Sequence, residues 1–319
     1  SKMREYKIDQ YVKSTAKKLK DQGAAPSSDL LSDALNKLKT DPRVYKVIHD
    51  DFKLSYAQTK VALAPLLDYQ KDLDQCENCP GYDQCQKLMP HYQMYLTYED
   101  GLVEPKFRLC DLAKKQEAYT KSFLRRDFPL DWMDMTVKHD VARTAKKTHA
   151  MKACFELLLG ASTRWLYVEG TRRSGRTFML ACLCNDFVNK GISPVAFCDT
   201  ALFLKWLQDM NIRDKARFDL EFEKYQNCAV LVLDDFGNEN KDKTGYGYSN
   251  ILYPLLNERA KRGLITCFSS DFSIQEIASM YQYTIGPARA RQLENLLLDL
   301  CEKEFDISSL DLSGSSRRR

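Results

Sequence analysis

The 319-residue sequence contains no apolar run of about 18 residues, the length that a membrane-spanning helix requires, so we expect neither a transmembrane segment nor a membrane partner. Its first ten residues have no apolar core of the kind found in signal peptides. The net charge is only +4, which excludes a strongly basic, histone-like protein. With 44% hydrophobic and 29% charged residues, the composition is that of ordinary globular domains.

The 11 cysteines, without an export signal, argue against a disulfide scaffold and favour a reducing, cytoplasmic location. They form two groups. Seven lie among apolar residues and are predicted to pack in the core as small hydrophobes: Cys154, Cys182, Cys184, Cys198, Cys228, Cys267 and Cys301. The other four lie in a polar segment: Cys76, Cys79, Cys85 and Cys110.

The four polar-segment cysteines have the spacing C-x2-C-x5-C-x24-C, which supplies enough thiolates for a closed, tetrahedral, structural zinc site. His91 is a fifth candidate that could replace Cys85 as a ligand. A redox C-x-x-C pair and an iron–sulfur cluster are the alternatives. The redox alternative lacks a surrounding βαβ pattern, and a cluster would be distinguished by its colour.

The first third of the chain is predicted to be mainly helical. No glycine lies between Gly23 and Gly81, leucines recur at helical spacing from residue 30 to 38, and a second helix is expected over 57–69. Aromatic and β-branched residues over 92–107 predict a small, metal-tied β element. We therefore predict a helical, zinc-binding domain over 1–113, a linker over 114–135 and a further domain over 136–319.

The segment from residue 136 alternates between helical and strand patterns. Such alternation predicts an α/β domain with a parallel sheet that is covered on both faces. The expected strands are 164–168, 194–198, 228–233 and 264–269, and the expected helices are 141–159, 177–189, 201–207 and 248–261.

A GxxxxG-R-T segment follows the first of these strands and opens the next helix, which is the context that a P-loop requires. Its residues are Gly170, Thr171, Arg172, Arg173, Ser174, Gly175, Arg176 and Thr177. Backbone N–H groups and the helix N-terminus would hold the phosphates of ATP, and the Thr177 hydroxyl would lie on Mg²⁺. Arg176 replaces the usual lysine; arginine can still pair with phosphate, so we expect binding to be kept while hydrolysis weakens. The alternative is a glycine-rich turn that has lost its ligand.

The buried strand over 228–233 ends in two acids, Asp234 and Asp235. Asp234 is predicted to hold Mg²⁺ through water, and Asp235 to polarise the attacking water. Ligands of parallel sheets bind at the carboxyl ends of the strands, so both motifs are expected to converge there. A helix cap or solvated turn is the alternative.

Three segments together resemble bacterial replicative helicase loaders of the DnaI/DnaC type. Leu233-Asp234-Asp235-Phe236-Gly237 and Cys267-Phe268-Ser269-Ser270-Asp271-Phe272 resemble the acidic strand and the sensor strand of their AAA+ domain. The cysteine segment over 76–85, with Cys110, resembles the zinc-bearing helicase-interaction domain of DnaI. The resemblance covers residues 76–300 and implies an AAA+ P-loop domain after a small, mainly helical zinc-binding domain.

This resemblance implies a cytoplasmic protein that binds the hexameric replicative helicase through its N-terminal domain. Its AAA+ domain would bind ATP and single-stranded DNA, associate with further copies on the helicase, and help to place the helicase on DNA during replication initiation. One alternative is a degenerate AAA+ adaptor that binds helicase without ATP turnover. Another is a transposition helper ATPase of the IstB type, against which the cysteine-bearing domain argues.

The sequence departs from the family pattern at three positions. Arg176 replaces the P-loop lysine, Asp271 stands where the sensor asparagine is expected, and Asn295 stands where a second arginine is common. All three changes alter complementarity to phosphate, so weak or absent hydrolysis is expected. Arg291 is the first candidate for a finger that reaches a neighbour's γ-phosphate, with Arg289 second; the alternative is that both are solvated.

Single-stranded DNA is the other predicted ligand of this domain. Its phosphates would be met by basic side chains, for which the candidates are Lys146, Lys147 and the tail Arg317, Arg318 and Arg319.

Overall fold

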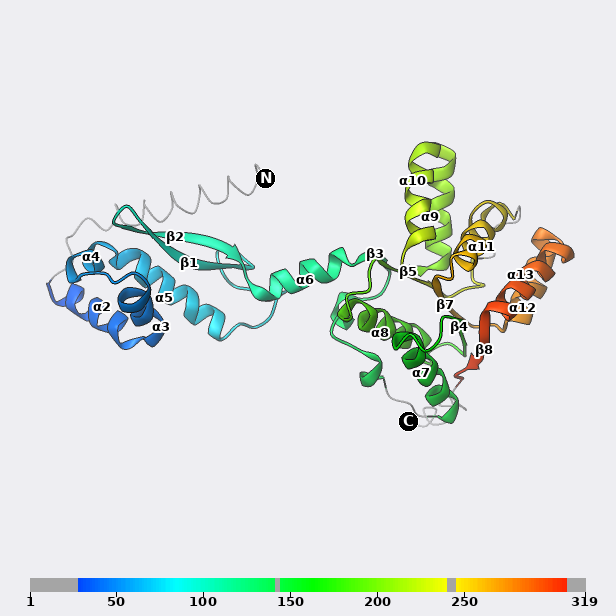
Figure 1. Cartoon of the computed structure of the whole chain (residues 1–319), viewed down its shortest axis with the longest axis horizontal. Helices are drawn as coiled ribbons and strands as arrows, with labels where there is room; N and C mark the ends of the chain where they lie inside the picture. The colour runs from blue at the N-terminus through cyan, green and yellow to red at the C-terminus, as the bar shows by residue number, and fades with distance from the viewer. Residues whose placement is uncertain (1–27, 141–143, 240–244, 309–319) are drawn as a thin grey trace, which may run out of the picture. The chain divides into compact units, whose positions relative to one another are not determined.

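The computed structural model describes residues 28–140, 144–239 and 245–308 (Figure 1). The described residues up to Gln116 form one compact unit, and those from Glu117 form a second. Within these residues no helix combines the length and the apolar character needed to cross a membrane. The Arg317–Arg319 tail and the first residues of the helix predicted over 141–159 lie outside the described residues.

The first unit consists of helices and one hairpin. Its elements are α2 (Ser28–Thr40), α3 (Pro42–Lys46), the π-helical turn η1 (Val47–Asp51), α4 (Tyr56–Val61), α5 (Leu63–Glu77), β1 (Tyr92–Glu99), β2 (Leu102–Leu109) and α6 (Asp111–Lys121), which continues into the second unit. The core is formed by Leu38, Val44, Ile48, Leu54, Ala62 and Leu66. The helix predicted over 57–69 is in fact two helices. Pro65 lies in the first turn of α5, where its missing N–H costs no helical hydrogen bond.

The hairpin contains the predicted aromatic segment. Strands β1 and β2 pair antiparallel from Tyr92 opposite Leu109 to Glu99 opposite Leu102. Asp100 and Gly101 connect them with φ angles of 52° and 80°, which is the backbone of the two-residue turn that matches strand twist.

The second unit is built on a six-stranded sheet in the order β3-β5-β6-β7-β4-β8, with every neighbouring pair parallel. Its strands are β3 (Phe123–Arg126), β4 (Trp165–Glu169), β5 (Val195–Asp199), β6 (Val230–Asp234), β7 (Ile265–Ser270) and β8 (Cys301–Asp306). The four predicted strands are β4 to β7. The segment that was predicted as a linker, 114–135, contains the edge strand β3, which pairs with β5.

Helices cover both faces of the sheet. Helices α7 (Ala145–Leu158) and α8 (Arg176–Asn189) pack on one face. The other face is covered by α9 (Thr200–Arg213), α10 (Lys215–Asn227), η4 (Tyr248–Leu252), α11 (Tyr253–Lys261), α12 (Ile274–Ile285) and α13 (Pro287–Leu300). Short 3-10 turns occur at η2 (Leu130–Trp132) and η3 (Val137–His139).

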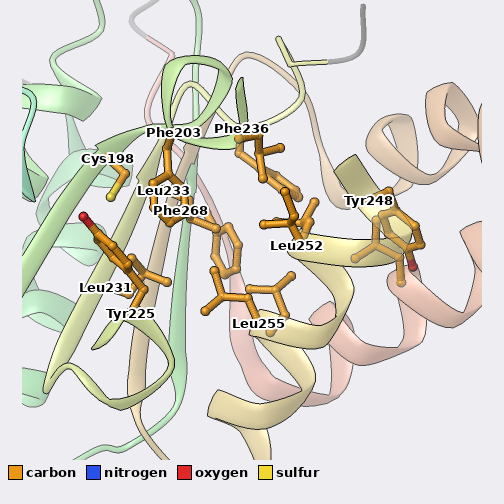
Figure 2. Close-up of a cluster of buried hydrophobic side chains, with 14 of the residues drawn as sticks. Cys198, Phe203, Tyr225, Leu231, Leu233, Phe236, Tyr248, Leu252, Leu255 and Phe268 are labelled. Atoms are coloured by element: carbon orange, nitrogen blue, oxygen red, sulfur yellow. The ribbon is translucent and has the colours of Figure 1, made fainter. Parts of the chain in front are cut away.

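The central strand β6 contributes side chains to the hydrophobic cores on both faces of the sheet. Val230 and Val232 point into the layer of α7 and α8, while Leu231 and Leu233 point into the opposite layer. Figure 2 shows Leu231 and Leu233 among aromatic side chains that include Phe203 and Phe268. A strand that is buried on both faces is apolar throughout, which is why this run was predictable from the sequence.

The seven cysteines that were predicted to be core residues are all buried, and this prediction is confirmed. Burial raises the pKa of each of their thiols; for Cys267 and Cys182 it reaches about 12. These thiols therefore stay protonated and pack as apolar groups.

Candidate functional site

The predicted phosphate loop joins β4 to α8, at the carboxyl edge of the sheet. The Gly170 N–H donates to the carbonyl oxygen of Ser270 (3.1 Å), which fastens the start of the loop to the end of β7. Arg173 and Gly175 have φ angles of 70° and 91°, so the loop turns back sharply before the helix begins at Arg176. The first helical N–H groups have no acceptor inside the helix and are available to an anion.

Ser174 has an unsatisfied polar atom in this loop. Its Oγ is buried and, among the described residues, has no hydrogen-bond partner. A Cβ atom added at Gly170 would lie 2.8 Å from that oxygen and 3.2 Å from the backbone nitrogen of Ser308, so a larger residue there would displace the Ser174 side chain. A buried hydroxyl without a partner beside a helix N-terminus is consistent with a phosphate ligand.

Thr177 and Asp234 form the candidate magnesium site. The Thr177 hydroxyl donates toward the Asp234 carboxylate at 3.1 Å, and the Ser269 hydroxyl donates to the same carboxylate. Burial raises the pKa of Asp234 to about 6, and the two hydroxyl groups oppose that rise. A carboxylate and a hydroxyl are oxygen donors of the kind that Mg²⁺ prefers, and Mg²⁺ in proteins usually keeps several water ligands.

Ser269 is a functional residue that the sequence did not single out, although it lies inside the quoted sensor segment. Its Oγ also accepts the backbone N–H of Asp235 (3.0 Å), so one side chain positions both acids at the end of β6. Asp235 has a left-handed φ of 53° and leaves half of its carboxylate exposed. Desolvation raises its pKa, and the nearby Arg176 opposes this.

Arg176 is buried, with 6% of its side chain exposed, and it makes four contacts. One terminal nitrogen, Nη1, donates to the carbonyl oxygens of Gly170 and Ser270. The other, Nη2, lies 2.7 Å from Asp271 Oδ1 and 3.3 Å from Asp235 Oδ1. Two of the three departures from the family pattern, Arg176 and Asp271, are therefore partners of each other.

The remaining predicted residues of the nucleotide site are exposed. Thr171, Arg172 and Arg173 face solvent on the loop, and the Thr171 N–H donates to Ser308 Oγ (3.0 Å). Arg291 and Arg289 are exposed on α13, where Arg289 donates to Ser249 Oγ (3.0 Å). The finger role of Arg291 stays a prediction.

Lys147 lies beside the phosphate loop. Its Nζ is 3.2 Å from where a Gly175 Cβ would be, and it forms a buried ion pair with Asp140 (2.6 Å). Lys146 instead pairs with Asp306 at the surface (2.5 Å). Of the two lysines proposed for DNA, Lys147 is thus engaged internally.

The four predicted zinc ligands line one cavity of about 340 Å³ in the first unit: Cys76, Cys79, Cys85 and Cys110, together with His91. Backbone N–H groups of His91 and Ala113 donate to Cys85 Sγ (3.5 Å) and Cys110 Sγ (3.4 Å). Over the described ranges, however, no three such ligands lie close enough together to hold a metal ion. The zinc site is therefore not supported by the structure as it stands, although the donor set fits zinc in number and kind.

The sheet order, the phosphate loop and the acidic strand end define the second unit as an α/β domain of the AAA+ type, as the sequence predicted. No family model matches the chain. The chain is 24% identical over 268 residues to the replicative helicase loader DnaI of Bacillus subtilis (strain 168), covering 81% of this chain and 83% of that protein. The predicted resemblance to helicase loaders of the DnaI/DnaC type is confirmed.

Solved structures with similar folds include a crystal structure of DnaI, with a TM-score of 0.51, 17% identity and coverage of 58% of this chain and 97% of that one. A putative primosome component from Streptococcus pyogenes serotype M3 matches with a TM-score of 0.48, 19% identity and coverage of 60% and 96%. The first of these likenesses establishes the fold alone.

Proposed function

We propose that this chain helps to load a hexameric replicative DNA helicase onto single-stranded DNA during replication initiation. The observation that carries the proposal is the similarity to DnaI, which extends over both units rather than over the P-loop domain alone. The unit that ends at Gln116 would bind the helicase. The second unit would bind nucleotide and single-stranded DNA and would contact further copies on the helicase.

Nucleotide control would operate at the carboxyl edge of the sheet. The loop from Gly170 to Thr177 would hold the phosphates of ATP, and Thr177 and Asp234 would hold Mg²⁺, which neutralises phosphate charge. Asp235 would orient a water molecule, and Arg291 would reach the site of a neighbouring copy. The roles of the loop, Thr177 and Asp234 are supported by the convergence of Thr177 with Asp234 and by the Ser174 hydroxyl, which has no partner among the described residues.

A loader that binds nucleotide with little or no turnover is the second candidate. It is favoured by the contacts of Arg176, whose guanidinium is held by Asp235 and Asp271 and by the carbonyl oxygens of Gly170 and Ser270. An arginine held in this way has little freedom to follow the terminal phosphate during hydrolysis.

We also keep zinc as a proposed ligand of the first unit. Four thiols on one cavity are in keeping with a structural metal, and backbone N–H groups already point to two of their sulfur atoms. Such an ion would lock the segment between α5 and β1 and would carry no chemistry of its own, because protein would fill all four positions.

Native mass spectrometry of the full chain mixed with its host's replicative helicase tests the main proposal. A helicase hexamer carrying several copies of the chain is expected. The absence of a complex both with and without Mg-ATP would contradict helicase loading for that helicase. ATPase assays with and without single-stranded DNA separate the two candidates, since only the first predicts turnover that depends on the assembly.

A further inference from the structure

The guanidinium of Arg176 is almost fully committed inside the protein. A guanidinium has five N–H groups, of which four are on the two terminal nitrogens. Two carbonyl oxygens face Nη1, and two carboxylates face Nη2. Any phosphate that is to pair with the terminal nitrogens of Arg176 must therefore replace a group that is already there.

Asp271 is the partner that a phosphate can replace. Of the two carboxylates that face Arg176 Nη2, that of Asp271 is the nearer, at 2.7 Å against 3.3 Å for Asp235. Asp271 therefore makes the stronger contact with Arg176. It is also a third exposed and follows the last residue of β7, and its other partner among the described residues is Asn238 at a long 3.4 Å. Asp235, by contrast, is held by the hydrogen bond from its backbone N–H to Ser269.

We propose that Asp271 acts as a built-in competitor of the terminal phosphate of a nucleoside triphosphate for Arg176. The inference rests on the proposed nucleotide site and deepens it. A carboxylate and a γ-phosphate both carry negative charge, and the two N–H groups of Nη2 already face Asp271 and Asp235, so a γ-phosphate reaches Nη2 only by displacing one of these carboxylates. The ion pair between Arg176 and Asp271 is formed when no terminal phosphate is present. A terminal phosphate replaces Asp271 only at the cost of this ion pair, so Asp271 weakens ATP binding more than it weakens ADP binding.

The competition predicts a specific change in nucleotide preference. Asp271→Asn keeps the shape of the side chain and removes its charge, so Arg176 is released to the terminal phosphate. We expect the ratio of ATP affinity to ADP affinity to rise by about tenfold, the scale of one charge-assisted contact. Asp271→Ser, a second way of removing the charge, is expected to act in the same direction and covers the case in which one variant folds poorly.

Titration of the full-length chain with fluorescent ATP and ADP analogues, in the presence of Mg²⁺, measures this ratio. Asp209→Asn is the matched control, because Asp209 is an exposed aspartate on α9 outside the site and should leave the ratio unchanged. The same Asp271→Asn substitution made in an Arg176→Met variant separates competition for Arg176 from simple repulsion between Asp271 and the phosphate. Competition requires Arg176, so the effect of Asp271→Asn should become several-fold smaller in that background.

An unchanged ratio in Asp271→Asn, or an equal change with and without Arg176, would overturn the proposal. So would the absence of any nucleotide binding in the natural protein and in both charge-removing variants. That last result would leave helicase binding untouched, because complex formation with the helicase is measured separately and without nucleotide. Failure of this inference and failure of the proposed function are therefore distinguishable.

Discussion

The hydroxyl oxygen of Thr177 lies 3.1 Å from each carboxylate oxygen of Asp234, although 57 positions separate the two residues in the chain. The parallel sheet causes this approach. Thr177 is in the first turn of the helix that follows β4, and Asp234 is the last residue of β6. The helix begins and β6 ends at the carboxyl edge of the sheet, where open α/β sheets bind their ligands.

Removal of the Thr177 hydroxyl is expected to weaken Mg²⁺-dependent nucleotide binding. Thr177→Ala should lower ATP affinity by about tenfold in the presence of Mg²⁺, the scale of one lost ligand contact, and should change it little in EDTA. Thr177→Ser keeps the hydroxyl and should retain most of the affinity. Fluorescent-nucleotide titrations in both media measure this, and equal losses in the alanine and serine variants would contradict the assignment.

Arg259 is expected to be a main stabilising residue of the second unit. It is fully buried, and it donates to the carbonyl oxygens of Tyr225 and Cys228 (both 2.9 Å) and to Ile265 (2.6 Å). Arg259→Met removes the charged donor from these buried acceptors and should lower the free energy of unfolding by about 3–5 kcal/mol.

Urea unfolding followed by tryptophan fluorescence measures this effect selectively, since all three tryptophans lie in the second unit: Trp132, Trp165 and Trp206. Arg262→Met is the control. Arg262 is half exposed and forms a surface ion pair with Glu258, so its loss should change the free energy of unfolding by less than about 1 kcal/mol. Similar effects of the two substitutions would show that the buried contacts contribute little.

Asp41 is expected to make the stability of the first unit depend on pH. Its carboxylate caps α3 and accepts hydrogen bonds from Arg43 and Gln70. The hydrogen bonds from Arg43, followed by the one from Gln70, hold the pKa of Asp41 well below its usual value, against the effect of burial. A lowered pKa in the folded state gives stability that is present above the unfolded pKa of about 3.9 and is lost as the pH falls through the folded pKa.

Asp41→Asn should therefore cost about 1 kcal/mol at pH 7, and the difference from the natural protein should narrow progressively below about pH 4. Hydrogen–deuterium exchange of the segment 42–51 measures this loss of stability. We expect roughly fivefold faster exchange in the variant at neutral pH. The exposed Asp33 provides the control, Asp33→Asn. A difference that stays constant from pH 7 to pH 3 would rule out the carboxylate as its source.

Metal analysis tests the cysteine cavity. We expect about one zinc ion per chain in protein that is purified without chelator, because four thiolates complete a tetrahedral site. Cys76→Ser or Cys79→Ser should lose most of that metal. Cys154→Ala alters a core cysteine instead and should keep it. Metal-free natural protein with an intact fold would remove zinc from the proposal.

The sequence predicted β4, β5 and β6 because each begins with a run of four apolar residues. The two edge strands escaped prediction for the opposite reason. Phe123–Arg126 contains two arginines and Cys301–Asp306 contains four charged residues, so neither resembles a buried strand. Helix α10 was missed although Phe218, Phe222 and Tyr225 recur at helical spacing, so the signal for it was present.

Those parts of the site that consist of continuous sequence motifs were predictable from the sequence. The glycine loop and the acidic pair were identified from local patterns, and the structure brings them together. The pairing of Arg176 with Asp271 was not predictable in the same way. It depends on β4 and β7 being neighbours in the sheet, and that adjacency is set by the crossover of strands rather than by any local pattern.

The distribution of cysteines has a practical consequence for chemical modification. Thiol reagents attack thiolates that they can reach, and the second unit offers none, since each of its seven thiols is buried with a raised pKa. Once any bound zinc is removed, alkylating dyes and cross-linkers should therefore attach only to Cys76, Cys79, Cys85 and Cys110. The natural chain thus carries attachment points on the proposed helicase-binding unit alone, without any cysteine having to be removed.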